Sequence, residues 1–336
     1  MLPVLDGLPH PWQEVAYVCT FLLGLVLLER GADWFVDATA TLARRLHAPQ
    51  TLVGLLTAGG EWEELVVVLV AVIGGHAGIA LGDIVGSCIA NILGSFPLGL
   101  FGRRPLVVER SARPYGLALV GVTLLVAGLL VVGPISRPVG GALVGIFALY
   151  LASILLALRR GLVRPDMLRT DEDDEDDEEE AREAMARRSL LVQLMFVVVG
   201  LGMVAVGALL VVEPAVHFAR LFGVSETVIG LTIVAIGTTL PDKALSLAGG
   251  LKARGGIVVA NAVGSNIFVL TLVLGLSALA APIVADQQTL RFDVPILAAS
   301  SLLLSVLIVR ERLHWRTGAV LLALYVGYLA LQVVIK

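Results

Sequence analysis

The stretch that decides the fold runs from Gly230 to Leu272 and reads GLTIVAIGTTLPDKALSLAGGLKARGGIVVANAVGSNIFVLTL. Two apolar segments of membrane-spanning length are joined by a short basic turn, and the first is interrupted by GTTLPDK at 237–243. A carboxylate and a proline are both costly inside a transmembrane helix, unless the break lines a polar cavity. The stretch therefore predicts a membrane-embedded ion site that includes Asp242.

The same plan occurs earlier in the chain, in residues 54–93. When Glu64 is aligned with Asp242, the two copies keep one difference of 178 in residue number, which pairs Gly59 with Gly237, Asp83 with Asn261 and Ser87 with Ser265. The chain is therefore predicted to be a duplication, and its symmetry is the main structural expectation.

The composition is that of a polytopic membrane protein. Hydrophobic residues make up 57% of the 336 and charged residues only 15%, with a mean hydropathy of +0.92. These values exclude a soluble domain with one core. Cys19 and Cys88 both lie in apolar segments, so no disulfide framework is expected.

Ten apolar segments have spanning length, because about 20 helical residues cross the hydrocarbon layer. We predict an all-α fold of ten transmembrane helices, with a five-helix repeat at 1–160, an acidic linker at 161–188 and a second five-helix repeat at 189–336. The predicted spans are 15–43, 51–74, 79–101, 114–133, 138–158, 189–212, 226–249, 256–280, 291–309 and 315–335.

The linker contains DEDDEDDEEE at 171–180 and is too charged to pack a core. We interpret it as a solvated tether, with weak cation sensing as the alternative.

The distribution of basic residues predicts the orientation. With the N-terminus outside, 18 Lys and Arg residues fall in inner loops or at their edges, and four fall outside. Both termini are then outside and the linker is cytoplasmic. Five helices in each half make the repeats inverted, and such proteins bind their substrate near the midplane between broken helices of both halves. Here these are helices 2, 3, 7 and 8, with helices 2 and 7 broken.

Asp242 and Thr238 are candidate ligands in the second copy. Pro241 cannot donate a backbone hydrogen bond, so carbonyl groups before it are free to face an ion, and Thr238 lies four residues before Asp242. Such hard oxygen ligands suit Na⁺, Ca²⁺ or Mg²⁺. The alternative is that Asp242 pairs with Lys243 for stability alone.

In the first copy, Gly59 and Gly60 can loosen the helix, and three glutamates follow. Glu64 faces inward by the repeat alignment, and Glu61 lies one turn back on a similar face. Glu63 points elsewhere in a regular helix, so we interpret it as an edge carboxylate.

Further candidates lie on helices 3 and 8. Asp83 and Asn261 are repeat mates, and Ser87 and Ser265 follow one turn later. The serines have ligation and helix packing as equal alternatives, and Asn91, one more turn along, is a further candidate ligand. Lys243 either neutralises a surplus carboxylate such as Asp83 or Glu61, or faces the inner mouth.

These motifs resemble the cation/calcium exchanger superfamily, which includes sodium/calcium exchangers. Its two repeats carry G-T-S-x-P-E and G-N-x-x-G-S-N-I-x-N/D patterns, which GTTLPD at 237–242 and Asn261 with GSNI at 264–267 match. The resemblance covers nearly the whole chain. It implies ion ligation by Glu64, Asp242, Thr238, Ser87, Ser265, Asn91 and the backbone near Ala235.

The sequence also departs from the family pattern at four positions. Asp242 replaces the usual glutamate, Gly60 a threonine, Glu63 a proline, and Val269 stands where a polar or acidic ligand is often found. The usual stoichiometry of sodium against calcium therefore does not transfer to this chain.

The function predicted is secondary active cation antiport by alternating access, with Ca²⁺ exchanged against Na⁺ or H⁺. A Na⁺/H⁺ exchanger of the same fold is the alternative. An intramembrane enzyme is disfavoured by the lack of HExxH and of a Ser/His set, and a structural or receptor protein has little use for duplicated carboxylates in broken helices.

We expect no cofactor beyond the transported cations. The expected partners are inorganic cations and the lipid bilayer, and no nucleic acid. The sequence does not define an oligomeric state, and a monomer is compatible with it. The short loops favour a prokaryotic plasma membrane.

Overall fold

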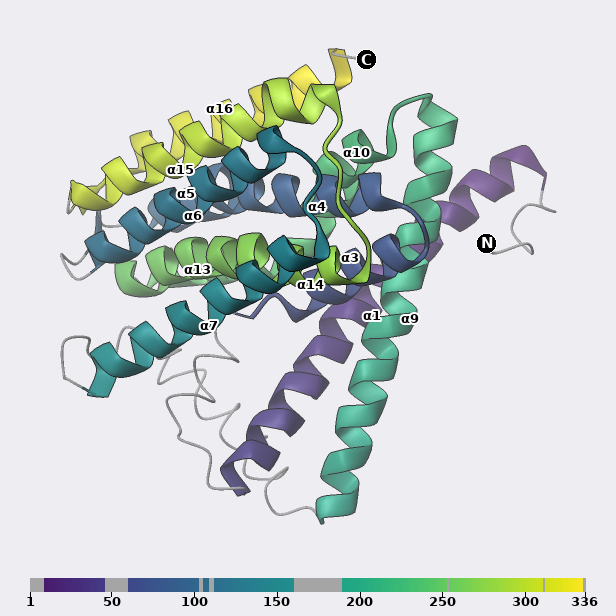
Figure 1. Ribbon diagram of the computed structural model, residues 1–336, viewed down its shortest axis with the longest axis horizontal. Coiled ribbons are helices and arrows are strands. Elements are labelled where there is room, and N and C mark those ends of the chain that lie inside the picture. The colour runs from purple at the N-terminus through teal and green to yellow at the C-terminus, as the bar shows by residue number, and fades with distance from the viewer. Residues whose placement is uncertain are drawn as a thin grey trace.

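The computed structural model describes residues 9–45, 60–102, 105–108, 112–159, 189–252, 254–310 and 312–334. The described residues form helices almost throughout, together with one short antiparallel pairing of β1 (Leu106–Val107) with β2 (Arg312–Leu313). Figure 1 shows two long helices that cross a stack of shorter ones. The predicted all-helical class is confirmed. The acidic linker at 161–188 lies outside the described residues.

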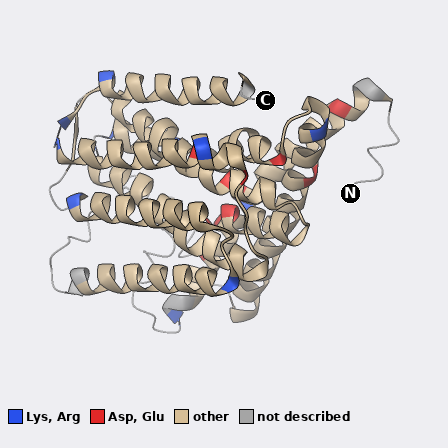
Figure 2. Ribbon diagram, turned by 45° about the horizontal axis from the view of Figure 1, so that its top comes forward, with Lys and Arg blue, Asp and Glu red and all other residues tan. Residues whose placement is uncertain are grey.

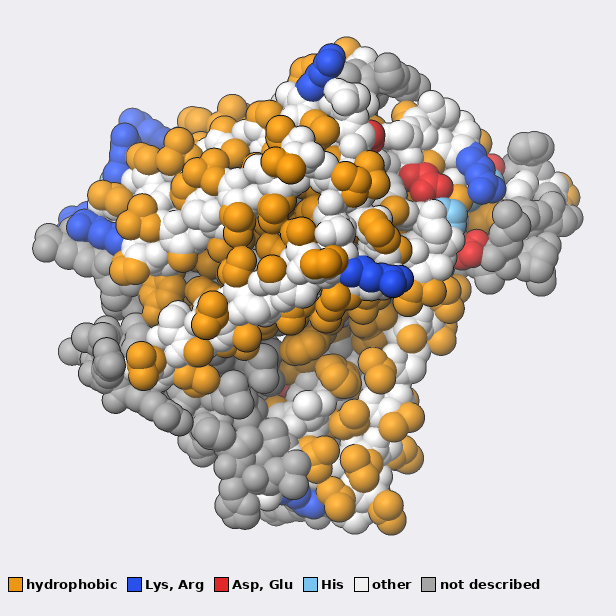
Figure 3. All heavy atoms as spheres, in the orientation of Figure 1, with side chains coloured by type: hydrophobic (Ala, Val, Ile, Leu, Met, Phe, Trp, Pro, Cys, Tyr) orange, Lys and Arg blue, Asp and Glu red, His pale blue; other side chains and the backbone are white. Residues whose placement is uncertain are grey.

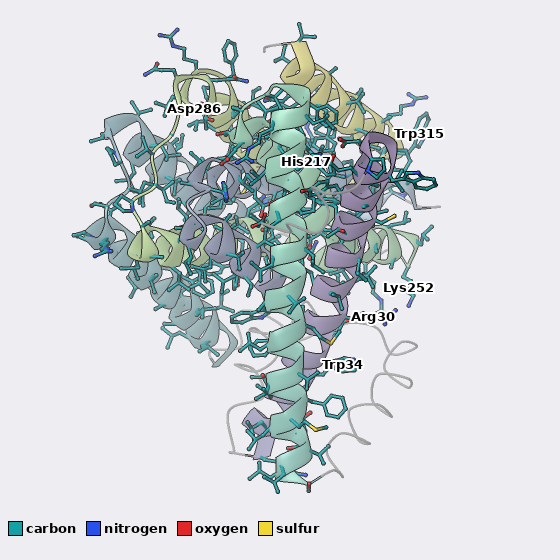
Figure 4. The ribbon with its side chains drawn as sticks, turned by 90° about the vertical axis from the view of Figure 1, so that its right-hand side faces the viewer. Arg30, Trp34, His217, Lys252, Asp286 and Trp315 are labelled. Carbon is teal, nitrogen blue, oxygen red and sulfur yellow. The ribbon has the colours of Figure 1, made fainter. Side chains whose placement is uncertain are left out.

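The two long helices are α1 (His10–Arg45) and α9 (Leu190–Phe222), which lie side by side (Figures 1 and 4). Gly24 contacts α9 at Gly207, and Gly31 contacts it at Gly200. As residue numbers rise on one helix they fall on the other, so the pair is antiparallel. The sixth predicted span ended at 212, whereas α9 continues to Phe222 and is closed by Gly223 in a left-handed conformation (φ 63°).

The central helices of the two halves match in length and position. In the first half they are α3 (Trp62–Ile73), α4 (Ala77–Ala90), the π-helical turn η1 (Asn91–Ser95), α5 (Phe96–Leu98) and the 3₁₀ turn η2 (Gly99–Phe101). In the second half they are α10 (Glu226–Ile229), η5 (Gly230–Val234), α11 (Ala235–Thr238), α12 (Leu240–Leu251), α13 (Gly255–Phe268), η6 (Val269–Val273) and α14 (Leu274–Ala280).

The repeat found in the sequence reappears in these boundaries. Both ends of α3 and α12, of α4 and α13, and of η1 and η6 differ by 178 residues. Repeat mates also touch directly, because the hydroxyl groups of Thr123 and Ser301 are 3.0 Å apart. The duplication is therefore a property of the structure as well as of the sequence.

The outer helices are α6 (Arg113–Val132), α7 (Arg137–Arg159), α15 (Val294–Val309), which follows the π-helical turn η7 (Thr289–Asp293), and α16 (Trp315–Val334). They cover the central helices. The best spanning window of α7 is 22% buried, whereas that of 77–101 is 89% buried. The face in Figure 3 is largely hydrophobic, and Lys and Arg lie mainly near helix ends (Figure 2). This is the pattern of a helix bundle whose outer surface faces lipid.

Seven described helices are long and apolar enough to cross a bilayer, or eight if a bent pair counts as one span. That pair, residues 226–238 and 240–251, bends by 48° at Thr239, where Pro241 interrupts the helix as predicted. The corresponding part of helix 2, residues 51–59, lies outside the described residues. The count of ten spans therefore stays a prediction.

Glycines allow the first half to approach the second closely. A Cβ atom on Gly82 of α4 would lie 2.9 Å from the Gly230 Cα, and one on Gly86 would lie 2.6 Å from the Leu231 carbonyl oxygen. The contact brings the polar residues of α4, Asp83 and Ser87, toward α11.

We predict that Gly82→Val destabilises the folded protein by roughly 1–3 kcal/mol or more, because backbone atoms would have to separate. Gly128→Val on α6 is the matched control, since nothing lies within 4 Å of its added Cβ. Thermal unfolding of the detergent-solubilised variants measures the difference. Equal melting temperatures for the two variants would contradict the close-packed contact.

Candidate cation site

The candidate site lies where α3 and α4 meet α11, α12 and α13 of the other half. Helix α4 packs against η5, α11 and α13, and α12 packs against α13 and η1. The structure buries all ten predicted site residues, each with 5% or less of its surface exposed: Glu61, Glu64, Asp83, Ser87, Asn91, Ala235, Thr238, Asp242, Asn261 and Ser265. Residues far apart in the sequence are thus collected inside the bundle.

One group of side chains centres on the Thr238 hydroxyl. Its Oγ1 lies 3.2 Å from Asp83 Oδ1, 3.4 Å from Glu64 Oε1 and 3.3 Å from Ser87 Oγ. The Ser87 hydroxyl is also 3.3 Å from Asp83 Oδ1. Two hydroxyl protons cannot satisfy every oxygen collected here. The group therefore has acceptor oxygens to spare, as a cation site requires.

A second group centres on Asp242. Its carboxyl group lies close to the side chains of Asn261, Glu61 and Asn91, and Glu61 interacts with Ser265. The repeat mate of Thr238 is Gly60, which has no hydroxyl group. Glu61, directly before α3, instead brings a second carboxylate to this group.

Both groups contain buried polar atoms without a hydrogen-bond partner. They are Glu64 Oε2, Asp83 Oδ2, Asp242 Oδ2, Asn91 Nδ2, Asn261 Nδ2 and Ser265 Oγ. Buried polar atoms are normally paired, and each unpaired one costs free energy, most of all when it is charged. A bound cation or proton would pair with these carboxylate oxygens, which come from both halves of the chain.

Neutral oxygens are needed to complete any such site. Within the described ranges, no three acidic, histidine or cysteine side chains converge closely enough to hold a metal ion. The hydroxyl and amide groups beside the carboxylates would therefore share the ligation. The Ala235 carbonyl is less free than its predicted role requires, because the Thr239 hydroxyl donates to it at 2.6 Å.

The structure shows the contacts of Lys243, whose two possible roles the sequence left open. Its ammonium group donates to the Ile236 carbonyl at 3.4 Å, to the Thr239 carbonyl at 3.2 Å and to the Thr239 hydroxyl. Asp242 and Glu64 interact with it through space. Lys243 therefore stays half-buried beside the site and covers carbonyl groups at the helix break, instead of pairing with Asp83 or Glu61.

Two further buried polar residues, Asn266 and Thr239, were not among the predicted site residues. Asn266 is completely buried and neither amide atom has a hydrogen-bond partner, yet only its place in the GSN motif pointed to it. Thr239 links Lys243 to the Ala235 carbonyl. Glu63 is half-buried and interacts with Asp242 and with Asp33 and Glu29 of α1, which agrees with an edge position.

Comparisons with known proteins agree with the motifs. A family model described as "Sodium/calcium exchanger protein" matches residues 16–156 and 192–334. The putative antiporter CaxA of Alkalimonas amylolytica is 32% identical over 91% of this chain and 95% of its own length. The sodium/calcium exchanger MaX1 of Methanosarcina acetivorans is 29% identical over 92% of this chain and 96% of its own length.

The fold is also similar to that of solved structures. The sodium-calcium exchanger NCX_Mj soaked with Na⁺ and Sr²⁺ superposes with a TM-score of 0.60 at 28% identity, covering 94% of this chain and 97% of that protein. Both the family model and these likenesses extend over the two halves that contain the buried carboxylates. The chain therefore belongs to the sodium/calcium exchanger protein family, and it is an integral membrane protein that transports inorganic cations.

Proposed function

We propose that this cation antiporter exchanges Ca²⁺ against Na⁺ or H⁺ by alternating access, at one site shared by Glu64 and Asp242. The observation that carries the proposal is the burial of both carboxylates on packed helices of opposite halves, each with an oxygen that has no partner. A divalent cation between two carboxylates neutralises both, and its release leaves charges that Na⁺ ions or protons can replace.

The proposed ligands divide between the two groups. Glu64, Asp83, Ser87 and Thr238 would hold a cation on one side, and Asp242, Asn261, Ser265, Asn91 and Glu61 on the other, with the Ala235 carbonyl as a backbone ligand. Glu64 and Asp242, one from each group, are proposed to hold the same exchanged ion, so one ion must leave before another binds. That competition couples the two fluxes.

The proposed architecture is ten helices in two inverted repeats, divided at 1–160 and 189–336 by a cytoplasmic linker, with both termini outside. The antiparallel pairing of the repeat mates α1 and α9 supports inversion. Bacterial and archaeal relatives support a prokaryotic plasma membrane.

The choice of ions follows from the relatives and from the charges. MaX1 is named a sodium/calcium exchanger, and NCX_Mj was soaked with Na⁺ and with a divalent cation, which favours Ca²⁺ against Na⁺. Lys243 beside the site and the missing hydroxyl at Gly60 favour the alternative, exchange of Na⁺ against H⁺. An ammonium group repels a divalent cation more strongly than a monovalent one.

We expect Glu64→Gln and Asp242→Asn each to lower exchange at least about a hundredfold, since each removes a charge that holds the cation in a site of low dielectric. The measurement is ⁴⁵Ca²⁺ and ²²Na⁺ flux in proteoliposomes under imposed Na⁺ and pH gradients. Glu226→Gln is the control, because Glu226 lies outside the site and pairs with His76 at 3.0 Å.

Wild-type flux in either site variant would refute the shared site. Na⁺ movement against H⁺ without any Ca²⁺ flux in the unmodified protein would establish the alternative.

Thr238→Val is predicted to weaken cation binding roughly 5- to 30-fold, because a hydroxyl contact worth about 1–2 kcal/mol is lost with little change in shape. Thr232→Val is the matched variant on the same broken helix, where the hydroxyl donates only to the Val228 carbonyl at 2.6 Å. Isothermal titration with Ca²⁺ and Na⁺ compares them. Equal losses in both variants would show that Thr238 is structural.

Lys243→Met is predicted to tighten divalent cation binding by roughly tenfold or more, because it removes a positive charge beside Asp242. Lys252→Met, at the exposed end of the same helix, leaves the affinity unchanged. Titration with Ca²⁺ gives both affinities. Weaker binding after Lys243→Met would mean that the ammonium group supports the ligands more than it repels the ion.

A further inference from the structure

One more carboxylate is completely buried in the part of the chain that the structure describes. Asp293 ends η7, at the start of α15, and none of its surface is exposed. It faces α16 through Tyr328 and Gln332. We call Asp293, Thr289, Tyr328 and Gln332 the Asp293 pocket, and none of these residues belongs to the site described above.

The two oxygens of Asp293 differ in their surroundings. Tyr328 Oη donates to Oδ1 at 3.1 Å, and Gln332 Nε2 donates to the same oxygen. Oδ2 is buried without a partner, and so is the hydroxyl oxygen of Thr289, four residues earlier on η7. Donors to one oxygen stabilise the ionised carboxylate, and the two unpaired oxygens are acceptors that a cation could use.

No protein cation supplies a counter-charge to Asp293 within the described ranges. The described side chains that interact with the Asp293 carboxylate are Tyr328, Gln332 and Asp286, and none of them is positively charged. A buried, ionised and unpaired carboxylate is strongly unfavourable inside a membrane protein. A bound cation would remove this cost.

The first half of the chain provides an internal comparison. At the same offset of 178, Tyr115 is the mate of Asp293 and Tyr150 is the mate of Tyr328. Tyr115 and Tyr150 also interact with each other, across α6 and α7. The first half therefore has two neutral phenol groups at the positions that Asp293 and Tyr328 occupy in the second half. Packing alone does not require a carboxylate there.

The chemistry of the pocket selects the class of ligand. Its acceptors are all oxygen atoms, which suits a hard cation, and a single carboxylate neutralises one positive charge. A π-helical turn such as η7 also displaces backbone groups from the regular pattern and is frequent at functional sites.

The pocket also lies close to an end of the bundle. The half-buried Gln288 donates to Gln332 Oε1 at 3.4 Å, and the exposed Asp286 lies just beyond it at the outer edge of the molecule (Figure 4). Asp293 therefore lies close to an exposed segment of the chain.

We propose that the Asp293 pocket binds one Na⁺ ion, at a site separate from the Glu64–Asp242 site. Asp293 Oδ2 and Thr289 Oγ1 are its side-chain ligands, and Tyr328 and Gln332 position the carboxylate. This proposal goes beyond the exchange function and does not depend on which ions are exchanged.

The test is ²²Na⁺ binding to the full-length protein in nanodiscs, in an Asp242→Asn background that weakens the exchange site. Asp242→Asn/Asp293→Asn should bind one Na⁺ ion per protein fewer than Asp242→Asn alone. Adding Thr289→Val to the background should weaken that ion's binding roughly tenfold. Glu226→Gln is the control, and should change nothing because Glu226 lies outside the pocket and pairs with His76 at 3.0 Å.

Asp293→Tyr controls for a loss of Na⁺ binding that is caused by misfolding of the Asp293→Asn variant, because it introduces the residue that the first half has at this position, Tyr115. It should fold and lose the same Na⁺ ion. Equal Na⁺ binding with and without Asp293 would overturn the proposal and leave a protonated carboxyl group as the explanation. Both members of each pair carry Asp242→Asn. The difference in bound Na⁺ between them therefore reports on the Asp293 pocket alone, even if Asp242 has no part in exchange.

Discussion

An ionised carboxylate can stay inside a lipid bilayer only if an opposite charge or a proton accompanies it. Glu64, Asp83, Asp242 and Glu61 are buried together in this protein, and Lys243 is the nearby cation, held at the helix break by carbonyl groups. The carboxylates therefore outnumber the fixed positive charge. Binding and releasing cations is the consequence of this imbalance, and the fold serves to keep the carboxylates together.

The duplication explains how such a site is built from one chain. Equivalent helices of the two halves each contribute a carboxylate, a small polar residue and a serine, and Gly82 and Gly230 let the halves approach within backbone contact. The two halves also differ at positions that set the charge of the site. Gly60 replaces Thr238, and Leu65 occupies the position of Lys243, so the two groups of ligands are related but electrostatically unequal.

Much of this was predictable from sequence, because hydrophobic length, the repeat and the helix-breaking proline are local signals. They predicted the helical class, the bend before Asp242 and the ten residues that the structure buries together. The contacts of Lys243 were not predictable, since they depend on how the carbonyl groups turn at Thr239. Asp293 escaped notice because it lies at the edge of a predicted span, and its partners on α16 are more than 30 residues away.

The central claim is that Glu64 and Asp242 hold one cation between the two halves. Crystals of the protein soaked with Sr²⁺, a divalent ion that gives an anomalous signal, test it most directly. The account predicts an anomalous peak between α3, α4, α12 and α13 that is coordinated directly by oxygens of both carboxylates, as a hard divalent cation such as Ca²⁺ would be. A peak bound by only one of them, or carboxylates too far apart to share an ion, would contradict it.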